Sequence, residues 1–218
     1  MSIGGTKPDL IFVELIHKSL RVDGTRLLDS VAALNLEHGP RRVPAIRAFF
    51  DQYSNQLQLH HSHEDRIFFP IVEARVGRER MRLDELTSQH DVLEAELRTI
   101  SHELALLDER GGDFAAGRVR ACDALSMMSE TLAAHLDLEE AAVLPLVESE
   151  IPVADYKGLE SQARHATPRA QAHFLIPWIV AHATPTQRKA LFRSAPPLRL
   201  VNLAARHRYR RLDLACTR

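Results

Sequence analysis

Four long stretches of this chain place apolar residues at alternating steps of three and four positions. This spacing is the repeat of one face of an α-helix, and over about 25–30 residues it is typical of long helices that pack side by side. Clusters of glycine and proline separate the stretches, at residues 37–44, 75–80, 109–117 and 148–156. Because the connections are short, neighbouring helices should run in opposite directions. The pattern predicts an all-α fold in which residues 1–150 form an antiparallel up-down four-helix bundle.

Each apolar series is interrupted by a histidine, or by a histidine and a glutamate. A single histidine on an apolar helix face is most often a core residue whose hydrogen bonds are satisfied. Four series with one histidine each are much harder to explain in this way. The interrupting residues are His17 in the first series, His60 and Glu64 in the second, His90 in the third, and His135 and Glu139 in the fourth.

The second and fourth stretches also repeat one another. Each contains a histidine, a glutamate four residues later, and a proline ten residues after the histidine. These residues are His60, Glu64 and Pro70 in the second stretch and His135, Glu139 and Pro145 in the fourth. The chain therefore looks like two copies of a helical hairpin, each of which supplies a histidine and then a His-x-x-x-Glu pair.

The His-x-x-x-Glu spacing suits metal binding. Residues four apart lie on the same helix face, so each pair can bind one metal ion or place its carboxylate between two. A buried glutamate without a partner costs several kcal/mol, so two of them inside a bundle require cations. Imidazole and carboxylate ligands without thiolate suit iron or manganese, and zinc also accepts them. The alternative is that the pairs are His–Glu contacts on the surface.

The two repeated segments, "HHSHEDRIFFP" and "HLDLEEAAVLP", begin at His60 and His135. With His17 and His90, they resemble the hemerythrin family in its bacterial HHE cation-binding form, over roughly residues 10–148. The resemblance implies a four-helix bundle that carries a non-haem di-iron centre, with two iron ions favoured over manganese or zinc. The ligands that it implies are His17, His60, Glu64, His90, His135 and Glu139, with the two carboxylates bridging.

One position departs from the oxygen-carrying members, which have a second histidine on the third helix, four residues after the first. Here that position is Glu94, which is a candidate seventh ligand, a proton-handling group or a surface residue. Tyr53, two turns before His60, is a candidate hydrogen-bond donor near a bound ligand, or a core tyrosine. Gly24 either permits a close helix contact or leaves a gap for a small molecule.

The other two histidines of "HHSHED" are not matched by metal-binding residue types in the second copy of the repeat. His61 aligns with Leu136 and His63 with Leu138. We therefore interpret His61, His63 and Asp65 as flanking polar residues rather than ligands.

The last third of the chain is basic, whereas the first part is acidic. Residues 1–150 carry a net charge of −10 and residues 151–218 a net charge of +9. Prolines at 168, 185 and 196–197 predict three or four shorter helices, which form a C-terminal extension that packs on the acidic bundle or on a second copy. Nucleic acid is not an expected partner, despite the run "RHRYRR". Three histidines of this region, at 165, 173 and 182, are interpreted as structural.

The resemblance implies a protein that binds and activates dioxygen, peroxide or nitric oxide. The added helices favour an oxidase or oxygenase that acts on a small organic substrate, and the alternative is a non-catalytic sensor or store of oxygen or iron. The sequence shows no signal peptide and no apolar run long enough to span a bilayer, so we expect a cytoplasmic protein without a membrane partner. Two cysteines, Cys122 and Cys216, do not form a thiol metal site. A homodimer is compatible with the charge pattern.

Overall fold

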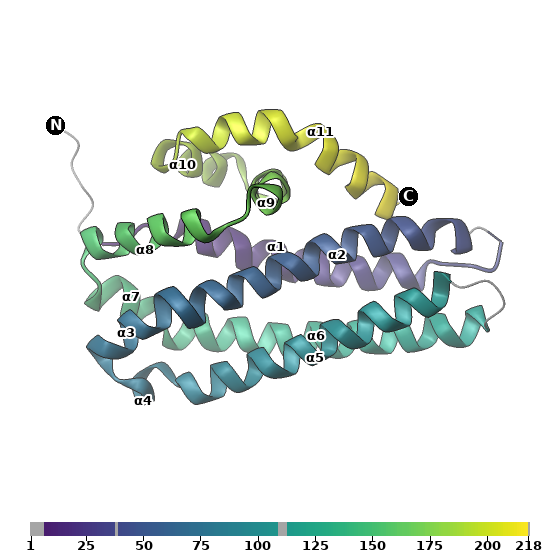
Figure 1. Cartoon of the computed structure of the whole chain (residues 1–218), viewed down its shortest axis with the longest axis horizontal. Helices are drawn as coiled ribbons and strands as arrows, with labels where there is room; N and C mark the ends of the chain where they lie inside the picture. The colour runs from purple at the N-terminus through teal and green to yellow at the C-terminus, as the bar shows by residue number, and fades with distance from the viewer. Residues whose placement is uncertain (1–6, 38, 109–112, 218) are drawn as a thin grey trace.

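The long helices of the chain lie side by side and turn back at alternate ends (Figure 1). The computed structural model describes residues 7–37, 39–108 and 113–217, which are almost entirely helical and contain no strand. The predicted all-α class is therefore confirmed. The four longest helices of the first part are α1 (Ile11–Ala32), α2 (Gly39–His63), α5 (Leu83–Asp108) and α6 (Phe114–Ala142).

The apolar face of α5 shows how the period-3–4 pattern becomes a core. Eight residues spaced three or four positions apart, from Leu83 to Leu107, are buried along this helix. This face packs on α2 and α6, and α6 also packs on α1. A fully buried leucine contributes about 1.5–3 kcal/mol relative to an exposed one. The sum over four such faces drives the helices together.

Local signals set several helix ends. The Asp113 carboxylate accepts a hydrogen bond from the backbone N–H of Ala116 and so caps the first turn of α6. Gly77 has a φ of +85°, which residues with a side chain rarely adopt, and it ends the helix before the short α4 (Arg78–Met81). A break also occurs between α7 (Leu144–Glu150) and the next helix, inside the predicted segment 148–156. The other two predicted breaks fall partly outside the described residues.

The second stretch is not one regular helix. After α2 the chain makes a wide π-helical turn, η1 (Glu64–Phe68), and then continues as α3 (Phe69–Val76). A π-turn contains an extra residue and so rotates everything that follows it. When the 3–4 spacing is continued from His60 and Glu64, the sequence predicts that Ile67 and Ile71 lie on the inner face. In the structure Ile71 is 40% exposed, and Phe69 and Val72 are buried instead. The prediction for Ile71 was therefore wrong, because the 3–4 spacing was extended through a turn of a different period.

Between residues 151 and 217 the structure has four helices, and they break at the prolines that the sequence indicated. They are α8 (Val153–Ala166), α9 (Arg169–His182), α10 (Pro185–Ser194) and α11 (Pro197–Thr217). Helices α9 and α11 pack on one another and on α1 and α2, while α8 lies against η1 (Figure 1). No helix in the described part of the chain is long and apolar enough to cross a lipid bilayer.

One buried carboxylate ties this C-terminal part to α1. Asp23 is fully buried and accepts hydrogen bonds from the indole Nε1–H of Trp178 (2.6 Å) and from Arg26 Nη1 (2.5 Å). The oxygen that accepts from Trp178 also lies 3.1 Å from Nε2 of His182. Arg26 in turn binds Asp213 of α11 at 2.5 Å. The charge of Asp23 is thus compensated by groups from both parts of the chain.

Candidate metal centre

Two groups of four buried side chains meet between the long helices. The first group contains His17 of α1, His60 of α2, Glu64 of η1 and Glu139 of α6. The second contains His61 of α2, Glu64 again, His90 of α5 and His135 of α6. Within each group the candidate ligand atoms all lie within 4.8 Å of one another. The six residues that the resemblance implied are therefore brought together, and His61 joins them.

Glu64 divides its two oxygens between the groups. Its Oε1 lies 2.9 Å from Nε2 of His60, and its Oε2 lies 3.4 Å from Nε2 of His90. In the first group Oε2 of Glu139 also lies 3.1 Å from Nε2 of His17. Glu139 belongs to the first group alone. A carboxylate with one oxygen in each group has the arrangement of a bridging ligand.

The inward-facing atoms have no hydrogen-bond partners. Each of the five histidines has an unpaired buried Nε2, and Glu64 has two unpaired oxygens and Glu139 one. These atoms lie close to one another, for example 2.9 Å between Nε2 of His60 and Oε1 of Glu64, but no hydrogen bond pairs them. A buried polar atom without a partner costs about 1–3 kcal/mol, so eight of them facing the same space are strongly unfavourable without a cation. The donor set therefore fits metal ions.

In three of the five histidines, the ring nitrogen Nδ1, which faces away from the cluster, contacts an oxygen acceptor. Nδ1 of His17 lies 2.9 Å from the Glu140 carboxylate, and Nδ1 of His90 lies 3.1 Å from Asp65. Nδ1 of His135 lies 3.2 Å from the amide oxygen of a glutamine, Gln89. A proton on Nδ1 satisfies each acceptor and leaves a lone pair on Nε2 that faces inward. This is the tautomer that metal-binding histidines adopt.

The charges of the cluster without a cation follow from its burial and its carboxylates. Burial opposes protonation of His17, but Glu139 and Glu140 outweigh it and raise the pKa of His17 to about 10. Burial likewise opposes protonation of His90, yet Asp65 and Glu64 raise its pKa to about 9. Without a cation, both rings therefore carry a second proton at neutral pH.

The remaining histidines of the second group stay neutral. Burial is the main cause that lowers the pKa of His135 to about 3, and burial together with the neighbouring His90 lowers the pKa of His61 well below its usual range. Burial disfavours the charge of Glu64, but His60 outweighs it and holds the pKa of this carboxyl well below its usual range. The second group thus combines an ionised Glu64 with neutral imidazoles at His61 and His135, which can present lone pairs.

Sequence reasoning missed His61 because it relied on the internal repeat, in which position 136 is leucine. On one helix His60 and His61 point about 100° apart, so each can serve a different group. Glu64 follows at the start of the π-turn and lies between them. The stacking of His61 on His90, with ring centroids 4.0 Å apart, places His61 in the second group. The sequence did contain a signal for His61, because it and His60 are adjacent and lie three and four residues before Glu64.

Other candidate residues lie elsewhere. The Glu94 side chain is 59% exposed and binds Arg98 at 2.6 Å, so it is not in either group. Tyr53 is buried, and its hydroxyl donates to the backbone carbonyl of Leu20 (3.1 Å). A Cβ on Gly24 would lie 3.2 Å from that hydroxyl, so this glycine permits a close approach of α1 and α2. His63 is half-buried and outside both groups.

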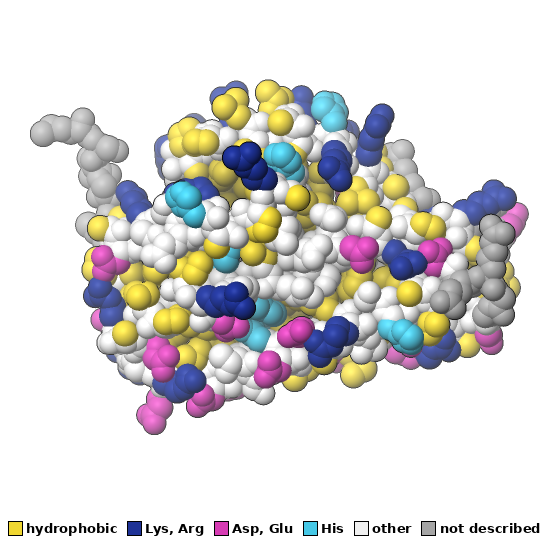
Figure 2. Space-filling model, in the orientation of Figure 1, with side chains coloured by type: hydrophobic (Ala, Val, Ile, Leu, Met, Phe, Trp, Pro, Cys, Tyr) yellow, Lys and Arg dark blue, Asp and Glu magenta, His cyan; other side chains and the backbone are white. Residues whose placement is uncertain are grey.

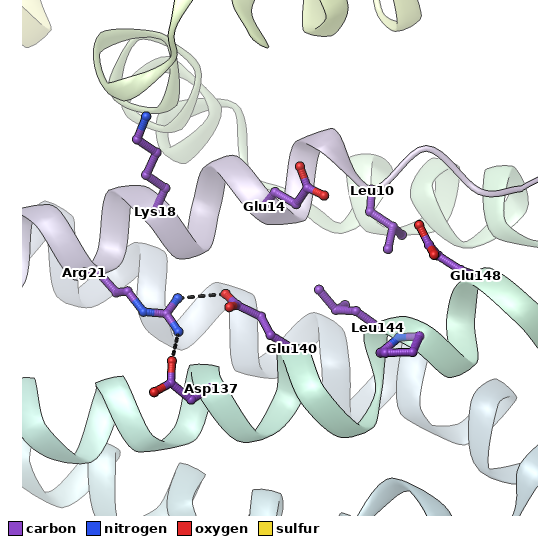
Figure 3. Close-up of a pocket in the computed structure, with 9 residues that line it drawn as sticks. Leu10, Glu14, Lys18, Arg21, Asp137, Glu140, Leu144 and Glu148 are labelled. Carbon is purple, nitrogen blue, oxygen red and sulfur yellow. Dashed lines mark hydrogen bonds and ion pairs between the residues drawn. The ribbon is translucent and has the colours of Figure 1, made fainter.

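A cleft of about 660 Å³ lies beside the first group, between α1 and the junction of α6 and α7 (Figure 3). In Figure 3, Arg21 points at Asp137 and Glu140, and it binds them at 2.5 Å and 2.7 Å. Hydrogen bonds from His17 and Arg21 are the main causes that lower the pKa of Glu140 to about 2. Glu140 thus lies between the cleft and the buried ring of His17.

Comparison with known proteins agrees with this geometry. Residues 12–147 match the family described as the hemerythrin HHE cation binding domain, which is more than half of the chain. The chain therefore belongs to this family, as its histidine and glutamate pattern predicted. Searches of curated proteins and of solved structures found no match.

Proposed function

We propose that this chain is a non-haem di-iron protein that binds and activates dioxygen, or its relatives peroxide and nitric oxide. One iron ion would be held by His17, His60, Glu64 and Glu139, and the other by His61, His90, His135 and Glu64. Residues 1–150 would form the antiparallel four-helix bundle around them, with residues 151–218 as a separate extension. The observation that carries the proposal is the division of the two Glu64 oxygens between the groups.

Iron fits this donor set better than its alternatives. Five imidazoles and two carboxylates without thiolate suit a redox-active metal of coordination number five or six. Bound iron would supply redox equivalents and Lewis acidity. The protein's own contribution is to hold the rings in one tautomer, through Glu140, Asp65 and Gln89, and to keep water away from the buried Nε2 atoms.

An oxidase or oxygenase is the activity that the surroundings favour. The cleft beside Glu140 is large enough for a small organic molecule. Glu140 lines the cleft and also contacts the ring of the proposed ligand His17, so only this residue separates the two. Glu140 is a carboxylate at neutral pH, so it can hold the proton of the His17 Nδ1 in place. The second candidate is a sensor or store, which the full burial of the inward atoms also supports, because it limits entry to small reactants.

Metal content and reaction with dioxygen test the proposal together. Protein reconstituted anaerobically with ferrous iron should hold two irons per chain by mass spectrometry, and its absorption spectrum should change on addition of oxygen. A change that decays faster with a candidate substrate would favour the enzyme, and a reversible change without turnover would favour the sensor or store. Protein that retains no iron after reconstitution would refute the proposal.

A further inference from the structure

Helix α11 packs on the protein through one face and leaves the opposite face in solvent. Its buried residues are Ala205, Tyr209 and Cys216. The Tyr209 ring meets the ring of Phe174 edge-on with centroids 5.5 Å apart, and the Cys216 carbonyl accepts a hydrogen bond from Arg42 (3.0 Å). The helix is therefore fixed on α9 and α2, and its outer face is available without rearrangement.

Three leucines, with the exposed His207 among them, form a crest along this outer face. Leu200, Leu203 and Leu214 are 71%, 54% and 39% exposed. Successive residues are about 100° apart around a helix, so these three fall within about 60° of one another, opposite the buried residues. Single exposed leucines are ordinary on protein surfaces. Three on one line of one helix are a local apolar feature that solvent alone does not explain.

Exposed arginines flank the crest on both sides. By the same helical geometry, Arg199, Arg206 and Arg210 lie on one side and Arg208 and Arg211 on the other. None of these five side chains forms an ion pair within the part of the chain that the structure describes. The single acid of α11, Asp213, is half-buried and already bound to Arg26. The positive charge of this face is therefore uncompensated.

The order of apolar and basic groups distinguishes the possible partners. Leucines at the crest with arginines beside them suit a lipid surface, where apolar side chains enter the acyl boundary and guanidinium groups reach phosphates. Nucleic acid binding would place cations, or aromatic rings that stack on bases, at the crest. The phenol ring of α11, Tyr209, is buried on the other side, and the crest holds three leucines against the single imidazole of His207.

A second copy of the chain is a poorer occupant of this face. Two such faces repel one another because both are basic. Helices α5 and α6 lie on the opposite side of the molecule from α11 (Figure 1). A contact between α11 of one copy and those helices of another would propagate from copy to copy rather than close into a dimer.

We infer that the outer face of α11 docks on an anionic lipid surface. Figure 2 shows hydrophobic and basic side chains interspersed along the upper edge of the molecule, over α11. The helix would lie on the membrane with its leucines inserted, while the metal cluster remains in the body of the protein. This docking goes beyond the proposed function.

Co-sedimentation of the full chain with lipid vesicles tests this inference. The protein should bind phosphatidylcholine vesicles that contain phosphatidylglycerol, should not bind vesicles of phosphatidylcholine alone, and should be released by raised salt. The double variant Leu200→Ala/Leu203→Ala should weaken binding about tenfold or more. The triple variant Arg199→Gln/Arg206→Gln/Arg210→Gln should weaken it about a hundredfold. The altered side chains are exposed, so helicity and metal content should not change.

Two matched controls keep the test specific. Met127→Ala, at a residue of α6 that is 61% exposed, and Arg120→Gln, on the same helix, should bind anionic vesicles like the parent protein. Equal binding to neutral vesicles, no binding at all, or binding that both α11 variants retain would overturn the inference. Tight binding to a DNA duplex that is indifferent to the leucine change would overturn it, and so would a dimer that the leucine change dissociates.

Discussion

His61 and His63 lie two positions apart on α2, and the structure gives them different surroundings. His61 is buried and stacks on His90, whereas His63 is half-buried and lies outside both ligand groups. We predict that His61→Ala lowers the iron content to one ion per chain or fewer, because the second group loses one of its three imidazoles. Metal analysis by mass spectrometry after anaerobic reconstitution gives the result.

His63→Ala is the matched control for this change, since it removes a neighbouring imidazole from the same helix. It should keep the full iron content. If the two variants retain equal amounts of iron, His61 is not a ligand and the second group is wrongly assigned.

Glu140 holds His17 from behind and is itself held by Arg21. Removal of such a supporting carboxylate typically costs 10–100-fold in metal affinity. We therefore expect Glu140→Ala to raise the dissociation constant for ferrous iron by about this factor, measured by competition with a chelator. Glu148→Ala alters another carboxylate of the same cleft that does not contact a candidate ligand, and it should leave the affinity unchanged. Equal losses in both variants would indicate an effect of cleft charge alone.

At the scale of single residues, the sequence predicted most of the cluster, because a polar residue on an apolar helical series is a strong signal. Six residues chosen in this way lie together in the structure. His61 was missed because an alignment of repeats discards any residue without a counterpart. The burial of Glu94 could not be predicted, because it is next to Leu93 in the sequence and adjacent residues of a helix point about 100° apart. In the structure Leu93 is buried and Glu94 is exposed.

At the scale of helices, Asp23 is the main polar contact between α1 and α9. Its carboxylate is fully buried and accepts hydrogen bonds from Trp178 and Arg26. Replacement of Asp23 by alanine leaves the buried indole N–H of Trp178 without an acceptor, whereas Arg26 keeps Asp213. A buried donor without an acceptor typically costs about 1–3 kcal/mol. We expect Asp23→Ala to lower the free energy of unfolding by about this amount in urea titrations.

Trp178 makes the location of this loss measurable, because it is the single tryptophan of the chain. In Asp23→Ala its fluorescence should change at a lower urea concentration than the far-ultraviolet circular dichroism signal, which follows all helices. Asp29→Ala, at an exposed acid on the same helix, is the control and should leave both transitions unchanged. Coincident transitions in Asp23→Ala would show that α9 and the long helices unfold as one unit.

The helices themselves were predictable because their apolar period is regular and their breaks coincide with glycine and proline. The π-turn η1 was not, since nothing in the periodicity marks the one extra residue before it occurs. Its result is visible in Ile71, which is exposed although the 3–4 spacing places it inside. The same turn carries Glu64 and Asp65, which face the centre and His90 respectively.

At the scale of the whole molecule, the metal-free protein should lose stability as the pH rises. The pKa of His17 is raised to about 10 and that of His90 to about 9, while an unfolded histidine titrates near 6.5. A raised folded pKa adds stability that is complete below about pH 6.5 and is lost as the pH passes through about 9–10. Urea unfolding of metal-free protein from about pH 7 to 10 should therefore show a falling free energy.

Iron binding should displace the same two protons. Loaded protein should keep a nearly constant free energy of unfolding over this range, and loading at pH 7 should release about two protons per chain to an indicator dye. Metal-free and loaded proteins that respond to pH in the same way would show that the ions do not bind at His17 and His90.

The division of Glu64 between the two groups has a consequence for how the centre assembles. An ion held by the first group would restrain the Glu64 carboxylate, whose Oε1 lies beside His60 and whose Oε2 lies beside His90. The entropy of ordering Glu64 would then already be lost when a second ion arrives, so we expect the second ion to bind more tightly than the first and, by linkage, each ion to strengthen the binding of the other. Chains at limiting iron should accordingly divide into empty and fully loaded molecules, with few that hold a single ion.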